Sequence, residues 1–203
     1  FIKYICNKNM SKELSDLLSL FKEKKFSLAE KKCLKLIKKI KPNYEIFNIY
    51  AVILFELNKY NDAIKYWKKS IELNQKYFFG FNNLGNVYLK KNDYQTALEY
   101  YDKATEIKID YFEAFHNKGN VLLSQQDLEG AIESYKDALR VNPKDHETRY
   151  NYTYVKKLLE EQQQNQDQEK NEDNQENKED KEQNEENNDN GDQNNENSKN
   201  REQ

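Results

Sequence analysis

Asparagine side chains at a fixed spacing are the residues of this chain whose type and position could do binding chemistry. Asn83, Asn117 and Asn151 follow one another at intervals of 34 residues. A side-chain amide carries two N–H donors and one carbonyl acceptor, so it can pair with a peptide backbone of any sequence. A stack of such amides therefore suits an extended ligand, while the alternative is that they are ordinary polar side chains or bond to one another between repeats. The residues expected beside this stack are Asn82, Asn86, His116 and Asn120.

Residue patterns typical of catalysis are missing from the sequence. The only histidines are His116 and His146, and neither has a cysteine or a pair of carboxylates at the spacing that a metal site needs. Four residues separate Gly80 from Gly85, but Asn86 follows where a phosphate-binding loop would place lysine. We therefore expect no enzyme, no metal, no cofactor and no small-molecule substrate.

The same interval of 34 residues connects the apolar positions that must hold these side chains in place. Small residues at this interval predict points where two helices cross closely. They are Ala29, Ala63, Ala97 and Ala131. A second series holds larger side chains that would fill the space around each crossing, and it comprises Cys33, Trp67, Tyr101 and Tyr135.

The residues 78–111 carry the pattern most fully. Phe81, Leu84, Gly85 and Tyr88 are followed by Ala97-x3-Tyr101 and Ala104, which resembles the tetratricopeptide repeat (TPR) family. The resemblance implies an all-α, right-handed solenoid of four helix pairs. Its repeats would span 10–43, 44–77, 78–111 and 112–145, the first of them degenerate. In this family the first helix of each pair lines the concave side, which implies that the asparagine stack faces a groove.

The segment Asn82-Asn83-Leu84-Gly85-Asn86 resembles the asparagine ladder of O-GlcNAc-transferase-type TPR superhelices. This implies a protein-binding module or scaffold that takes a protein or extended peptide segment. The alternative is the TPR fragment of a glycosyltransferase-type enzyme whose catalytic domain is absent from this chain. Some TPR domains bind the C-terminal carboxylate of a peptide through Lys or Arg side chains. That kind of binding is not expected here, because the second position of the repeats is occupied by Glu45, Phe79, Glu113 and Glu147.

The ends of the chain differ from its repeats. Residues 1–9 are an N-terminal extension, 146–162 are expected to form a capping helix that covers the last repeat, and 163–203 are an Asn/Gln/Glu-rich tail expected to be disordered. Residues 161–203 have a net charge of −10, which leaves +7 on residues 1–160 of the whole chain's −3. The stretch from 145 resembles the Gln-rich ends of bacterial aerotolerance-operon TPR proteins, which would imply peripheral association with a membrane complex.

Composition narrows the partners and the compartment. Nine lysines lie between Lys22 and Lys41, but no arginine and few aromatic residues are interleaved, so a solvated helix face is favoured over a nucleic-acid site. Cys6 and Cys33 are too few for a disulfide framework, and no apolar run is long enough to cross a membrane. A cytoplasmic location is favoured, with the cell envelope or periplasm as the alternative if a signal peptide is missing before Phe1.

Overall fold

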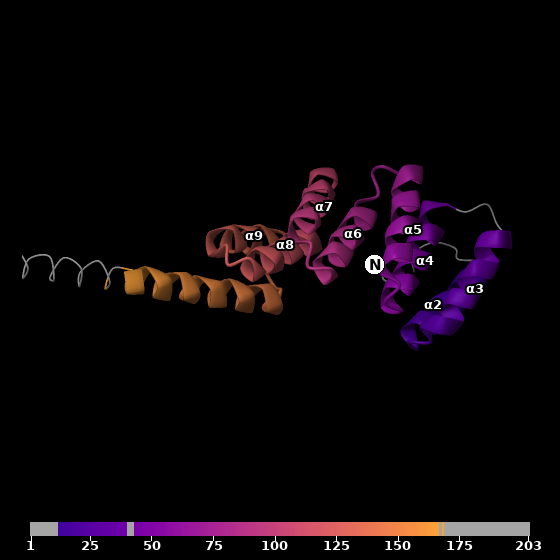
Figure 1. Ribbon diagram of the computed structural model, residues 1–203, viewed down its shortest axis with the longest axis horizontal. Helices are drawn as coiled ribbons and strands as arrows, with labels where there is room; N and C mark the ends of the chain where they lie inside the picture. The colour runs from indigo at the N-terminus through magenta and orange to yellow at the C-terminus, as the bar shows by residue number, and fades with distance from the viewer. Residues whose placement is uncertain (1–11, 40–42, 167, 169–203) are drawn as a thin grey trace, which may run out of the picture. The chain divides into compact units, whose positions relative to one another are not determined.

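The computed structural model describes residues 12–39, 43–166 and 168, and this part of the chain contains helices and turns but no strand. The all-α fold predicted from the sequence is confirmed. Eight helices can be followed in Figure 1. They are α2 (Lys12–Lys22), α3 (Phe26–Lys39), α4 (Tyr44–Glu56), α5 (Tyr60–Leu73), α6 (Phe78–Lys90), α7 (Tyr94–Ile107), α8 (Phe112–Ser124) and α9 (Leu128–Val141).

Consecutive helices pack as antiparallel pairs, because only short turns join them. The pairs are α2 with α3, α4 with α5, α6 with α7 and α8 with α9. Each pair also packs on the next one, since α5 contacts α6 and α7 contacts α8. The first helices of neighbouring pairs touch as well, α4 with α6 and α6 with α8. Side chains on these first helices can therefore reach across from one pair to the next.

The turn inside each pair uses the same backbone conformation. One residue in each turn has a positive φ, between 56° and 62°, and the four residues lie 34 apart: Lys24, Asn58, Asn92 and Gln126. Asparagine adopts this left-handed region more readily than most residues, which explains its presence in two of the four turns. Asp93 caps the helix that follows one of these turns, because the Thr96 N–H donates to Asp93 Oδ1 at 3.2 Å.

The predicted core register is confirmed by burial. Ala29, Ala63, Ala97 and Ala131 are all 0% exposed, and the larger residues four positions later are at most 2% exposed. Glycine is needed where a tyrosine ring lies against the first helix of its pair. A Cβ atom at Gly85 would lie 2.5 Å from Cε1 of Tyr101, and one at Gly119 would lie 2.5 Å from Cε1 of Tyr135. The ring therefore approaches the helix backbone more closely than any side chain at the glycine would permit.

A further helix spans residues 146–166, across the boundary between two compact units, Phe1–Val155 and Lys156–Gln203. Within the second unit Lys156 pairs with Glu160 at 3.6 Å and Lys157 with Glu161 at 3.5 Å, an i,i+4 spacing that supports helix. The helix therefore runs past the predicted end at 162, and residues 163–166 are helical instead of belonging to the tail. The rest of the predicted tail, apart from 168, and the extension 1–9 lie outside the described residues.

Replacing Gly85 with alanine tests the close approach of the Tyr101 ring. Helix propensity alone would make Gly85→Ala stabilising by about 0.5–1 kcal/mol. The contact with the ring reverses the sign, so we expect a net loss of about 1–3 kcal/mol in the free energy of unfolding, measured by urea denaturation. In a Tyr101→Leu background the same Gly85→Ala change should cost far less. An equal cost in both backgrounds would show that the ring is not the obstacle.

Candidate functional site

The asparagine ladder (Asn83, Asn117 and Asn151) joins the first helices of consecutive pairs. Asn117 on α8 donates through Nδ2 to two oxygens on α6, Oδ1 of Asn82 at 3.2 Å and Oδ1 of Asn86 at 3.1 Å. Asn83 donates to Asn48 Oδ1 on α4 at 3.1 Å. Asn151, in the helix that follows α9, donates to Asn120 Oδ1 on α8 at 3.2 Å. The amide N–H groups of the ladder therefore form inter-repeat hydrogen bonds, the alternative that the sequence left open.

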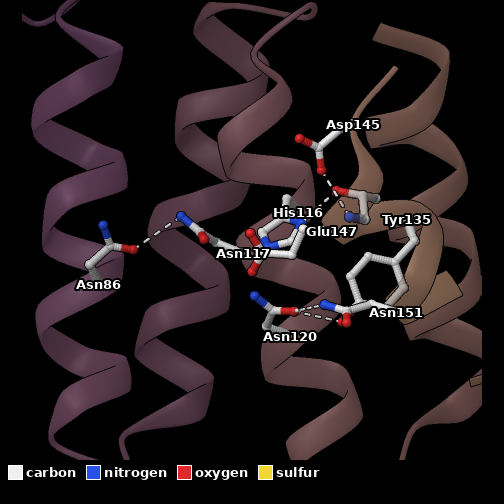
Figure 2. Close-up of polar contacts among 9 residues, drawn as sticks. Asn86, His116, Asn117, Asn120, Tyr135, Asp145, Glu147 and Asn151 are labelled. Atoms are coloured by element: carbon white, nitrogen blue, oxygen red, sulfur yellow. Dashed lines mark hydrogen bonds and ion pairs between the residues drawn. The ribbon is translucent and has the colours of Figure 1, made fainter. Parts of the chain in front are cut away.

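A tyrosine hydroxyl also donates to two of these acceptors and holds them in place. The Tyr101 hydroxyl donates to Asn86 Oδ1 at 2.8 Å, and the Tyr135 hydroxyl donates to Asn120 Oδ1 at 2.6 Å. Burial raises the pKa of Tyr135 to about 12 and raises that of Tyr101 as well, so both phenols keep their protons near neutral pH. The oxygens of Asn86 and Asn120 thus accept from two directions, and Figure 2 shows these side chains in a row with Asn117 and Asn151.

In the second repeat a different buried side chain donates to the asparagine oxygen that links it to the next repeat. Val52 stands where the later repeats place Asn86 and Asn120, and Trp67 stands where they place tyrosine. The Trp67 indole N–H instead donates to Asn48 Oδ1 at 2.8 Å, one helical turn earlier on the first helix. Asn48 is fully buried, and its Nδ2 atom has no hydrogen-bond partner among the described residues.

Half of each amide remains available to a ligand. Within the described part of the chain, no hydrogen bond is found for Nδ2 of Asn86 and Asn120 or for Oδ1 of Asn83 and Asn117. All four side chains are partly exposed. Donors and acceptors of this kind alternate along an extended peptide backbone, so the free halves of these amides are complementary to it.

These groups face a pocket of about 500 Å³. Six of the seven residues singled out in the sequence line it: Asn82, Asn83, Asn86, His116, Asn117 and Asn120. Asn151 does not line it. Asn82 differs from the expectation of an open groove residue, because it is only 5% exposed. Asn117 bonds to its oxygen, and the packing of α6 against α8 encloses the rest of the side chain.

Aromatic residues in the pocket wall were not identified from the sequence. They are Phe79, Tyr111 and Phe112. The rings of Phe79 and Tyr111 lie edge to face with centroids 5.5 Å apart. Runs of aromatic residues at the start of two successive first helices, Tyr77 to Phe79 and Tyr111 to Phe112, were the pattern that could have revealed this wall.

One end of the pocket is acidic and is built around the start of the helix 146–166. Asp145 caps that helix, since the Thr148 N–H donates to Asp145 Oδ2 at 2.8 Å, and this bond holds the pKa of Asp145 below its usual value. Thr148 Oγ1 lies 2.6 Å from Nδ1 of His116, whose Nε2 is 3.7 Å from Glu147 Oε1 (Figure 2). His116 is thereby fixed in the wall. Over the described residues no group of three His, Cys, Asp or Glu side chains could hold a metal ion, and no helix is long and apolar enough to cross a membrane.

Family comparison agrees with the helix pairs and the core register. The tetratricopeptide repeat model matches residues 79–111 and 112–145, and a second TPR repeat model matches residues 52–92. The chain is a tetratricopeptide repeat protein. No curated protein matches its sequence.

Several solved structures share the fold at low sequence identity. MamA 41-end from Desulfovibrio magneticus RS-1 is 17% identical with a TM-score of 0.63, over 73% of this chain and 84% of that one. The TPR protein YrrB, described as having an unusual peptide-binding site, is 20% identical with a TM-score of 0.59, over 71% and 73%. The first TPR of Spaghetti (RPAP3), bound to the HSP90 peptide SRMEEVD, is 19% identical with a TM-score of 0.55, over 58% and 93%.

Removing one ladder amide of this TPR array should reduce its stability. Asn117→Ala deletes two inter-repeat hydrogen bonds, and the higher helix propensity of alanine offsets part of the loss. We expect the free energy of unfolding to fall by about 1–2 kcal/mol. Gln95→Ala, which removes an exposed amide on α7, is the matched control and should change stability little. Equal stabilities for the two variants would show that the ladder bonds do not hold the repeats together.

The Asp145 cap predicts a difference at acid pH. Because the folded state lowers the pKa of this carboxyl below 3.8, its contribution to stability is present above that pH and is lost as the pH falls through the folded value. Asp145→Asn keeps a capping acceptor but cannot titrate. The melting temperature of the wild type should therefore fall more between about pH 5 and pH 2 than that of the variant. Parallel melting curves over this range would contradict the assignment.

Proposed function

We propose that this TPR protein is a non-enzymatic interaction module that binds an extended peptide segment of a protein partner in the pocket lined by the asparagines. One observation carries the proposal. Side-chain amides from successive repeats present free donors and acceptors to a single pocket while their other halves are bonded to the protein. Two of the structural neighbours, the Spaghetti domain and YrrB, are described with a bound peptide or a peptide-binding site, which supports the same class of ligand.

The ladder favours binding because it orders the amides before a ligand arrives. A free asparagine side chain would lose rotamer freedom when it binds, at a cost of about 0.5–1.5 kcal/mol for each flexible side chain. Here the hydrogen bonds from Tyr101 to Asn86 and from Tyr135 to Asn120 already fix the two amides. Most of that cost is met during folding, and more of the interaction with the peptide remains as affinity.

A binding experiment can separate the pocket from the outer face. Peptides selected from a random display library on the full chain would serve as probes, and their affinities would be measured by fluorescence polarisation. Asn83→Ala combined with Asn117→Ala removes two free acceptors and should weaken binding by about 10-fold or more, since each lost hydrogen bond is worth about 0.5–1.5 kcal/mol. Circular dichroism would establish that the variant is folded at the assay temperature.

The control replaces two exposed lysines on second helices, Lys103 and Lys136, with alanine. Neither lysine lines the pocket, so binding should be nearly unchanged. If the folded asparagine variant still binds every selected peptide while the lysine variant loses them, the outer face is the working surface and the proposed function is wrong.

A further inference from the structure

The charged carboxylates and cations of the pocket lining are unequally represented. Among the described residues the lining contains three carboxylates, Glu113, Asp145 and Glu147, and no lysine or arginine. Resting on the proposed function, we infer that the pocket selects peptide segments with basic residues, arginine above all, and rejects acidic ones. The occupant is thus a partner segment that places an arginine side chain at the acidic end of the pocket while its backbone runs along the asparagines.

The three carboxylates are not equally available. Asp145 is committed to the helix cap, where it accepts from the Thr148 N–H at 2.8 Å. Glu147 faces His116 at 3.7 Å, but its side chain is 78% exposed, so most of the carboxylate is open to a ligand. Glu113 is exposed on α8, and no ion pair to it is found among the described residues. Two carboxylates can therefore receive a cation, and the third adds to the negative potential.

The aromatic wall favours arginine over lysine. Phe79 and Phe112 are partly exposed, whereas Tyr111 is only 6% exposed and packs edge to face behind Phe79. A guanidinium is planar, is weakly hydrated and stacks on aromatic faces while it forms two hydrogen bonds to a carboxylate. A compact ammonium group can use the carboxylate but gains less from the rings.

A nearly buried side chain with an unpaired donor in the same pocket, among the described residues, independently points to a ligand. Asn82 lines the pocket and is only 5% exposed, and its oxygen accepts from Asn117. No hydrogen bond from its Nδ2 group is found within the described residues, and this group, unlike that of Asn48, is not fully buried. A peptide carbonyl is a neutral acceptor that such a donor can bind from the pocket. The pocket therefore combines a backbone-reading amide with side-chain selection by charge.

Charge also argues against the chain's own tail as the occupant. Residues 161–203 have a net charge of −10, and they would be repelled by the three carboxylates of a pocket in which the described residues supply no lysine or arginine. The lysine-rich segment 22–39 of a second copy has the right sign, but it contains no arginine and is already folded into helices. A partner segment with arginine fits the lining better than either.

The experiment selects random twelve-residue peptides on the full chain, after the library has been cleared on a synthetic peptide of residues 169–203 to remove binders of the acidic tail. The selected peptides should be rich in arginine and poor in aspartate and glutamate. Replacing the arginine of a selected peptide with citrulline, its neutral analogue, should weaken binding. The peptide SRMEEVD, which has three acidic residues and one arginine, should bind more weakly than the selected arginine-rich peptides.

Variants of the chain assign the effect to the pocket. Glu113→Gln with Glu147→Gln should weaken the arginine peptide by about two- to fivefold for each carboxylate, as expected for exposed ion pairs, and should leave the citrulline peptide unchanged. Glu106→Gln on α7 is the matched control, because Glu106 is exposed and does not line the pocket. An equal loss with Glu106→Gln would mean that net charge alone acts, and the inference would be overturned.

The remaining outcomes separate this inference from the proposed function. Selected peptides that lose affinity with Asn83→Ala and Asn117→Ala but show no excess of arginine would overturn charge selection and leave peptide binding in place. A library with no binder sensitive to the asparagines would overturn both. A dimer in light scattering that an arginine peptide dissociates would identify a second copy as the occupant and overturn the assignment to a partner.

Discussion

The hydrogen bond from a buried tyrosine hydroxyl to an asparagine oxygen is the interaction on which the rest of the pocket depends. Tyr101 can reach Asn86 only because Gly85 lets its ring lie against α6. The same oxygen then accepts from Asn117 on α8. One carbonyl oxygen thus connects three helices from two repeats. Because the phenol is buried and keeps its proton, the direction of donation is fixed, and the amide N–H groups of Asn86 have no partner among the described residues.

The second repeat shows what this arrangement requires and what it costs. With Val52 in place of the acceptor, the polar atom of the large buried side chain still needs a partner, and Trp67 finds it in Asn48. The Asn48 oxygen also accepts from Asn83, so the link between repeats is kept. Its Nδ2 group is buried without a partner among the described residues, an arrangement that usually costs about 1–3 kcal/mol. The tyrosine version avoids this cost by placing the acceptor where its amide remains partly exposed.

Sequence spacing was sufficient for the fold because burial in this chain is periodic. Ala97 and its equivalents, and Gly85 with its tyrosine, depend on one helix crossing that recurs every 34 residues. The pocket was less accessible to sequence reasoning, because each amide orientation depends on donors from two other helices. For this reason the sequence could not decide between ligand contact and inter-repeat bonding at Asn117. It placed Asn82 in the groove without showing that α8 would enclose it.

Folding and recognition divide the polar atoms of the ladder between them. Every bond that Asn117 donates to α6 stabilises the stacking of repeats, and its oxygen, which takes no part in that stacking, is left to the pocket. Such amides can supply affinity for any extended backbone, but they cannot distinguish one sequence from another. Discrimination between peptide sequences must come from side chains that carry a charge or have a distinctive shape. In the lining these are Glu113, Glu147 and the aromatic wall. Exposed ion pairs contribute only about 0.2–1 kcal/mol each, so these carboxylates would act mainly by disfavouring acidic segments. The amides would bind the backbone of the segments that remain.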